Sequence, residues 1–154
     1  MPEPRSTHPK LERALERLEA ADLAGACAAP APPELRKAIE EFNSGEFFEQ
    51  HETLELLWRA TPEDIRHLYE GILQIGVGFY HLLTKRNFHG AAVKLDHGIR
   101  LLEAFPGSCH GVDVARLRAE ARVAREQLLS LGPERLASFD RQLVPRVHLT
   151  ADGV

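Results

Sequence analysis

One short stretch of the chain places an imidazole and two carboxylates within five residues: His51, Glu52 and Glu55. The stretch from Phe47 to Trp58 has the spacing of an amphipathic helix, at ~100° per residue. His51 lies beside its apolar stripe, Glu55 borders that stripe, and Glu52 points further round. Polar groups next to a buried face need partners or they cost stability. The pattern therefore indicates a hydrogen-bonded structural histidine, a metal or substrate site, or a partly solvated edge.

The spacing of these residues is His-Glu-x-x-Glu, which differs from the His-Glu-x-x-His motif of zinc peptidases. Glu55 stands where that motif has its second histidine, so the peptidase mechanism is not predicted. Glu52 is the candidate base if the site is catalytic.

A second helix, expected from residue 65 to about residue 85, can complete the site. It is apolar around most of its circumference, which predicts a central position. Its polar side chains form one narrow stripe: His67, Glu70, Gln74 and His81. Gly71 and Gly78 flank the stripe, and because each glycine costs roughly 1 kcal/mol relative to alanine in a helix, they predict close approach of another helix. Exposure of the whole stripe to solvent is the alternative.

The two helices are joined by a few residues, so we expect them to pack antiparallel. That register places His51 opposite Gln74 and Glu55 opposite Glu70, with His81 roughly 10 Å further along the helix. We therefore predict a polar cluster of these first four residues, with His81 as a distant neighbour. Through His51, Glu55 and Glu70 the cluster could bind a divalent metal, as inward Glu and His side chains do in helical di-iron proteins. Without metal, two close carboxylates would raise one pKa and act as an acid/base pair.

A longer motif contains these residues. The run F-N-x-G-x-F-F-E-x-H-E-x-L-E-x-x-W spans residues 42–58, and Tyr-Glu-Gly-Ile-Leu-Gln and Tyr-His follow at 69–74 and 80–81. It resembles a family of small bacterial and archaeal helical proteins known as domain of unknown function three hundred and nine. The resemblance covers roughly residues 35 to 105 and implies an all-helical single domain. It implies no reaction, because none is established for that family.

Composition fits one soluble globular domain of 154 residues, with 44% hydrophobic and 27% charged residues. The net charge of −4 argues against a nucleic-acid binder. Four arginines between residues 116 and 125 alternate with glutamates and predict a solvated, salt-bridged surface. Cys27 and Cys109 lie far apart and do not indicate a disulfide framework. With no signal-peptide pattern at the start and no membrane-spanning run, a cytoplasmic location is expected.

The fold class expected is all-α, a single domain of antiparallel helical hairpins that is loosely tetratricopeptide-like. About seven helices are predicted: 7–22, 34–43, 47–60, 65–85, 88–105, 113–132 and 133–143. The predicted organisation is an N-terminal helix (1–24), an extended Pro/Ala linker (25–33), a helical core (34–143) and a tail (144–154). Apolar residues of the first helix, Leu11, Leu15 and Leu18, can pack on the same chain or form a homodimer.

The sequence names no ligand or reaction. The leading hypothesis is a small binding or scaffold-type protein with a His/Glu cluster between two core helices. One alternative is a metal-assisted hydrolase that uses this cluster, and another is a partner-binding module with an exposed groove. The cofactor is therefore unknown, with a divalent metal as the one candidate.

Overall fold

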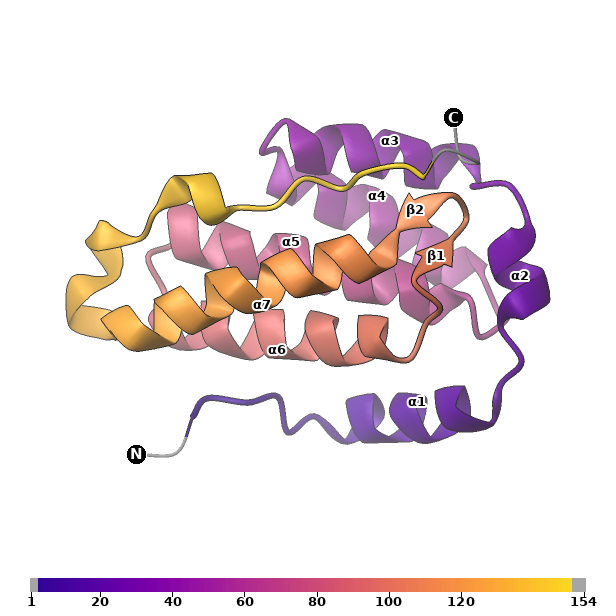
Figure 1. The fold of residues 1–154 in the computed structure, drawn as a ribbon, viewed down its shortest axis with the longest axis horizontal. Helices are drawn as coiled ribbons and strands as arrows, with labels where there is room; N and C mark the ends of the chain where they lie inside the picture. The colour runs from indigo at the N-terminus through magenta and orange to yellow at the C-terminus, as the bar shows by residue number, and fades with distance from the viewer. Residues whose placement is uncertain (1–2, 151–154) are drawn as a thin grey trace.

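The computed structural model describes residues 3–150, which form an all-α single domain with one small hairpin (Figure 1). The helices are α1 (Pro9–Ala20), α2 (Ala24–Ala28), α3 (Pro33–Asn43), α4 (Phe47–Ala60), α5 (Arg66–Leu83), α6 (Phe88–Glu103) and α7 (Val114–Leu131). Strands β1 (Ser108–Cys109) and β2 (Val112–Asp113) pair antiparallel between α6 and α7. Two 3₁₀ segments, η1 (Pro133–Ser138) and η2 (Arg141–Leu143), follow α7. Among residues 3–150, no helix combines the length and apolarity needed to cross a bilayer.

Local signals in the sequence explain most helix boundaries. The Asn87 side chain accepts a hydrogen bond from the Gly90 amide and caps α6, and Asp113 does the same for Arg116 at the start of α7. Gly45, with φ of 75°, allows the tight turn between α3 and α4. The predicted helices at 34–43, 47–60, 65–85 and 88–105 are therefore found within a few residues of the expected ends.

Three details of the predicted boundaries are wrong. Helix α1 begins at Pro9 instead of residue 7, because His8 caps it and its Nδ1 accepts from the Lys10 amide. Helix α5 ends at Leu83 instead of residue 85, and Thr61 at the end of α4 donates its hydroxyl to the Leu57 carbonyl. The segment expected to be extended contains the short helix α2.

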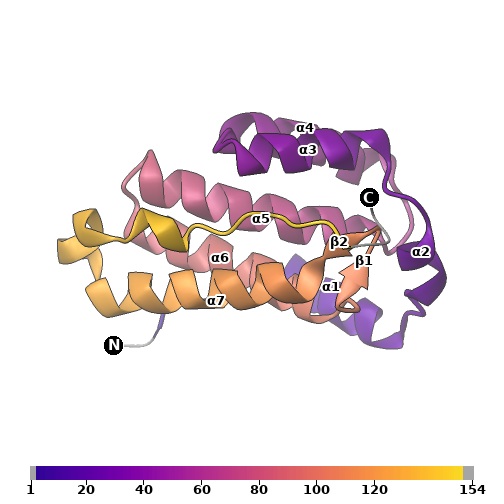
Figure 2. The ribbon, with the colours of Figure 1, turned by 45° about the horizontal axis from the view of Figure 1, so that its top comes forward.

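Helix α5 is central: most of its residues are buried, and it packs between α4 and α6 (Figure 2). A Cβ added at Gly98 of α6 would lie 2.7 Å from the Gly71 carbonyl oxygen of α5. A Cβ at Gly78 would lie 2.7 Å from the Leu95 side chain. The glycines of α5 thus mark close helix approach, as the sequence predicts.

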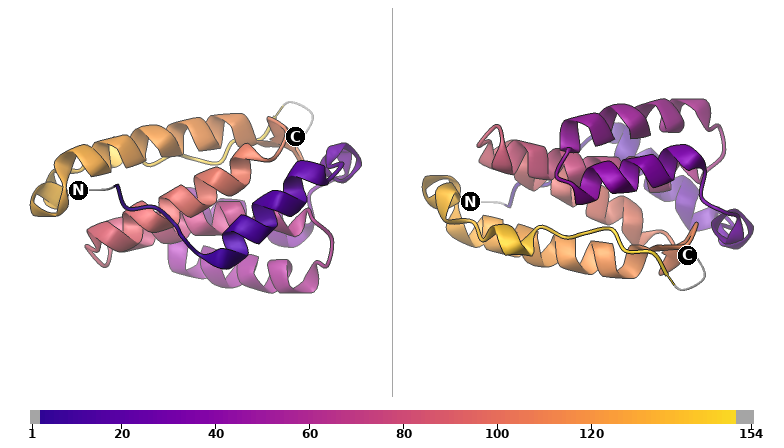
Figure 3. Two further views of the ribbon diagram at one scale, coloured as in Figure 1. Left: turned by 90° about the horizontal axis from the view of Figure 1, so that it is seen from below. Right: turned by 90° about the horizontal axis from the view of Figure 1, so that it is seen from above.

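The N-terminal helix α1 crosses the α5–α6 pair on the side away from α3 (Figure 3). Its Leu11, Ala14 and Leu18 are buried in the same core as the other helices, so they pack on their own chain. Helix α2 then leads from this side to α3, and Cys27 within it forms a disulfide with Cys109 of β1. The sequence analysis expected no such disulfide, because residues 82 apart give no local sign of meeting.

The arginines of α7 divide into two kinds. Arg116 and Arg122 form exposed ion pairs with Glu120 and Glu103, as predicted. Arg118 instead donates to two carbonyls at the end of α6. Arg125 is buried, and its guanidinium donates to the backbone of α6 and of the N-terminal segment.

Candidate functional site

The carboxylate of Glu70 lies between two histidines near the crossing of α5 and α6. Its Oε2 is 3.0 Å from Nδ1 of His67, one helical turn earlier. Its Oε1 is 3.3 Å from Nε2 of His97 on α6. The close approach of the helices at Gly71 and Gly98, each the next residue in its helix, brings Glu70 and His97 within reach. Only 16% of the Glu70 side chain is exposed.

Burial raises the pKa of Glu70, but hydrogen bonds from His67 and His97 outweigh it, so the pKa is lowered to about 2. The group is therefore a carboxylate at every physiological pH, and it acts as an anion and acceptor. The raised pKa predicted for one of two close carboxylates is not that of Glu70. Its hydrogen-bond partners are two imidazoles and not a second carboxylate.

The network continues from Glu70 into the N-terminal segment. His97 Nδ1 lies 3.3 Å from the Ser6 hydroxyl, and the Ser6 amide donates to Asp96 at 2.8 Å. Arg100 donates to the Ser6 carbonyl at 3.2 Å. The order hydroxyl, imidazole, carboxylate is that of a hydrolase triad. Ser6 is only 4% exposed and lines neither cleft described below, so the chain of contacts anchors the segment and offers no accessible nucleophile.

The two polar stripes identified in the sequence meet at a small cleft of about 160 Å³. Its lining residues are His51, Glu55, Trp58, Glu70, Leu73 and Gln74. The register of α4 against α5 is set by a nearby contact, in which the buried Gln50 side chain packs on Gly76. A Cβ added at Gly76 would lie 2.6 Å from Gln50 Oε1. This contact agrees with the register that pairs His51 with Gln74.

The carboxylates at this cleft have separate partners. Glu55 pairs with Arg59 at 2.6 Å and with His51 at 3.5 Å, whereas Glu70 pairs with His67 and His97. Within the described part of the chain, no three His, Cys, Asp or Glu side chains are grouped so that they could hold a metal ion. The metal set His51, Glu55 and Glu70 stays a prediction.

Two other predicted site residues lie away from the cleft. Glu52 is exposed on α4 and is not among the lining residues. His81 lies further along α5, where burial and the charges of Lys94 and Lys85 lower its pKa.

A larger cleft of about 460 Å³ opens beside the small one and shares Trp58, Glu70 and Gln74 with it. Helix α1 and the residue before it supply one wall, and α5, α6 and the α4–α5 loop supply the other. Five cationic side chains line the cleft: Lys10, Arg13, Arg17, Arg66 and Lys94. Three histidines line it as well: His8, His67 and His97. The lining carboxylates are Asp64 and Glu70.

The charges at this cleft are not balanced. Asp64 already pairs with Arg17 at 3.0 Å, and Glu70 with its two histidines. Lys10, Arg13 and Lys94 have no carboxylate within 4 Å among residues 3–150. The cleft is therefore positive.

Two residues that line both clefts contain polar atoms without a hydrogen-bond partner in residues 3–150. Trp58 Nε1 and Gln74 Oε1 are both buried, and neither has a hydrogen-bond partner within the described chain. Arg66 lies over the Trp58 ring, 4.3 Å from its centroid. Trp58 shares a helical face with Phe47 and Leu54, a position that predicts substantial burial, but it is only partly buried and lines the cleft.

The pairing of Glu70 with His67 and His97 was not predicted from the sequence, where His67 is only one member of the α5 polar stripe. His89, His97 and His110 lie outside the motif, and surface positions are the usual expectation for such histidines. That expectation is wrong for His97 and His110, which are both 8% exposed, whereas His89 is exposed. The available signal for His97 was Gly98, a glycine that marks close helix packing inside an apolar helical pattern.

One family model matches a part of the chain that lines the cleft. Residues 35–93 match Domain of unknown function (DUF309). The DUF309 match confirms the resemblance drawn from the motif, over a segment that ends earlier than expected. It contains Trp58, Glu70 and Gln74, and it excludes α1 and His97. A search of curated proteins finds no match to the chain.

Proposed function

We propose that this protein binds a small organic anion in the cleft between α1 and the α5–α6 wall. The observation that carries the proposal is the pair of unpartnered buried atoms, Trp58 Nε1 and Gln74 Oε1. Buried polar atoms are nearly always hydrogen-bonded, and each orphan costs stability. A ligand with one acceptor and one donor would satisfy both atoms if the side chains that cover them moved aside as it bound.

The charge of the cleft supports an anion. Lys10, Arg13 and Lys94 have no carboxylate partner, and the two carboxylates present are already paired. A concave surface with excess charge of one sign concentrates ligands of the opposite sign. The volume of about 460 Å³ lies within the range of small-molecule sites.

A metal-assisted hydrolase is the second candidate. Its support is that His51, Glu55 and Glu70 line one small cleft. Glu55 would have to exchange Arg59 for the metal, and Glu70 its histidine partners, which makes this candidate the weaker one.

The only tryptophan of the chain, Trp58, gives the binding test its signal. Inorganic phosphate, pyrophosphate, citrate and ATP are titrated into the oxidised protein while tryptophan emission is recorded. We expect a saturable change with at least one of these anions, weakened by salt because exposed charges contribute to binding. Spermidine and glycerol, which carry no negative charge, are expected to give no change.

Matched variants locate the binding site. Arg13→Gln combined with Lys94→Gln is expected to weaken binding about tenfold, equivalent to ~1.4 kcal/mol. The control is Arg122→Gln, which removes an exposed cation that pairs with Glu103 outside the cleft. A panel without any response, or equal weakening by the control, would contradict the proposal.

A further inference from the structure

The segment 3–32, here called the arm, supplies one wall of the cleft and is fastened at both ends. Near its start, Ser6 is held by Asp96, His97 and Arg100. In the middle, Leu11 and Leu18 are buried. The ion pairs of α1, Arg17 with Asp64 and Arg100 with Glu12, are largely exposed, and such pairs contribute little to stability.

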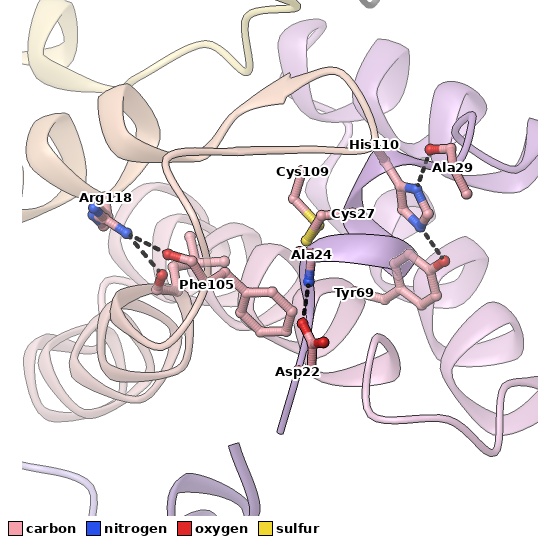
Figure 4. Close-up of a disulfide and its surroundings, with 10 residues drawn as sticks. Asp22, Ala24, Cys27, Ala29, Tyr69, Phe105, Cys109, His110 and Arg118 are labelled. Atoms are coloured by element: carbon pink, nitrogen blue, oxygen red, sulfur yellow. Dashed lines mark hydrogen bonds between the residues drawn. A yellow bond between two sulfur atoms is a disulfide. The ribbon is translucent and has the colours of Figure 1, made fainter. Parts of the chain in front are cut away.

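The far end of the arm is fastened covalently (Figure 4). Cys27 of α2 is bonded to Cys109 of β1, and the amide of His110 donates to the Cys27 carbonyl at 2.7 Å. His110 Nδ1 lies 2.8 Å from the Ala29 carbonyl, which can only accept, so this nitrogen carries the proton. Nε2 of His110 then accepts from the Tyr69 hydroxyl at 3.0 Å. Burial, with Glu34 and Glu63 nearby, raises the pKa of Tyr69 to about 12, so the hydroxyl keeps its proton.

The two sulfurs differ in access. Cys27 is 8% exposed and lines an open groove of about 860 Å³ beside α2, together with Ser108 and His110. Cys109 is fully buried. A small thiol can approach Cys27 through this groove, which leaves Cys109 as the departing sulfur.

We propose that the Cys27–Cys109 disulfide is a redox latch that holds the arm against the cleft. A thiolate attacks Sγ of Cys27, the S–S bond breaks, and the Cys109 thiolate takes up a proton. A second thiol attacks the mixed disulfide and releases Cys27 as a thiol. Two thiols are thereby oxidised to one disulfide, and the protein disulfide gains two electrons and two protons. The latch would regulate the cleft and so rests on the proposed function.

The disulfide can hold the arm closed because the two residues that it links are far apart in the sequence. The disulfide joins positions 82 apart, so it suppresses open states in which α1 and α2 leave the core. Without it, the far end of the arm is held by the hydrogen bonds of His110 and by the buried Leu23, and the start by the contacts of Ser6 and of Arg125. Opening of such a segment is a local event that leaves the remaining helices folded.

Hydrogen exchange on the full, ligand-free chain tests the latch. The oxidised protein is compared with protein reduced by dithiothreitol under native conditions, and a thiol assay confirms two free thiols. We expect the amides of α1 to exchange about tenfold faster after reduction, while those of α5 and α6 keep their rates. Acrylamide quenching of Trp58 is expected to rise, because the wall opposite it has opened. In Cys27→Ser, the α1 amides are expected to exchange as fast as in reduced wild type, and dithiothreitol is expected to leave their rates unchanged.

Three results would overturn the latch: unchanged α1 exchange in reduced protein, equal acceleration in all helices, or no release of thiols before unfolding. The second result would make the disulfide a general stabiliser of the fold. Because exchange is measured without ligand, these outcomes are independent of anion binding. If the oxidised protein binds none of the anions, the proposed function fails while the exchange data still decide the latch. If it does bind, reduction is expected to weaken the affinity.

Discussion

Tyr69 and Glu70 are neighbours on α5, and each holds one end of the arm through a histidine. The Tyr69 hydroxyl bonds to His110, whose other nitrogen reaches the backbone after α2. The Glu70 carboxylate bonds to His97, whose other nitrogen reaches Ser6. Successive residues of a helix point ~100° apart, so the two contacts lie on different sides of α5. Two successive residues of α5 therefore each provide one of the hydrogen-bonded anchors of the arm.

Glu70→Gln is expected to change the pH dependence of stability at acid pH. The pKa of Glu70 is lowered from 4.5 to about 2, so its carboxylate stabilises the folded state above pH 4.5. That contribution is lost as the pH falls through the folded-state value near 2. At ~1.4 kcal/mol per pKa unit, the difference from wild type should reach about 3 kcal/mol at pH 7 and shrink toward pH 2. Urea unfolding between pH 2 and pH 7 measures it.

The control for this experiment is Glu52→Gln on α4, which is exposed. Its difference from wild type is expected to stay small over the whole range. A constant difference for Glu70→Gln between pH 2 and pH 5 would show that the two histidines do not hold the carboxylate in the folded protein.

A double-mutant cycle can identify the partner of Glu70. We expect His97→Ala and Glu70→Gln each to cost about 1–3 kcal/mol, because each leaves a buried group unpaired. Their effects should be coupled by about 1 kcal/mol. His51→Ala combined with Glu70→Gln should be closer to additive, since His51 faces Glu55. Stronger coupling to His51 than to His97 would favour the cluster predicted from the sequence.

The predicted metal set has a direct test in thermal melts. A site formed by His51, Glu55 and Glu70 predicts that Zn²⁺ or Mn²⁺ raises the melting temperature of wild type but not of Glu70→Ala. Because Arg59 forms an ion pair with Glu55 at 2.6 Å, Arg59→Ala should increase the metal-induced rise in melting temperature. If neither ion shifts the melting temperature of wild type or of Arg59→Ala, the metal prediction fails.

Leu18→Ala tests how strongly α1 belongs to the core. Leu18 is 3% exposed, and emptying such a site costs about 2–4 kcal/mol. Leu56→Ala on α4, where the side chain is 69% exposed, is the matched control and should cost less than about 0.5 kcal/mol. A loss for Leu18→Ala as small as that of the control would support the sequence-based boundary, in which the first helix is separable from the domain.

The helices could be predicted because their signals are local. Apolar spacing and caps such as Asn87 and Asp113 act within one or two turns. The α4–α5 register followed from a short connection between antiparallel helices, and Gln50 against Gly76 agrees with it. The disulfide was missed because nothing near Cys27 or Cys109 in sequence indicates that they meet.

The site was less predictable than the fold, because partner choice depends on distant elements. His51, Glu55, Glu70 and Gln74 do line one cleft. The groups that bind Glu70 depend on how α6 is rotated about its axis, and the positive wall depends on where α1 docks. Neither follows from the periodicity of a single helix. The predictions of a cytoplasmic location, a homodimer and a bound metal stay predictions.

The boundaries of the family match divide the cleft between two parts of the chain. Residues 35–93 supply Trp58, Glu70 and Gln74, whereas Lys10, Arg13, Lys94 and His97 lie outside the match. The matched segment thus supplies Asp64, Arg66 and His67 as well, and the flanking segments supply the three cations without a carboxylate partner in the described part of the chain. If the cleft binds an anion as proposed, substitutions in α1 can change which anion this chain accepts without disturbing the α4–α5 pair.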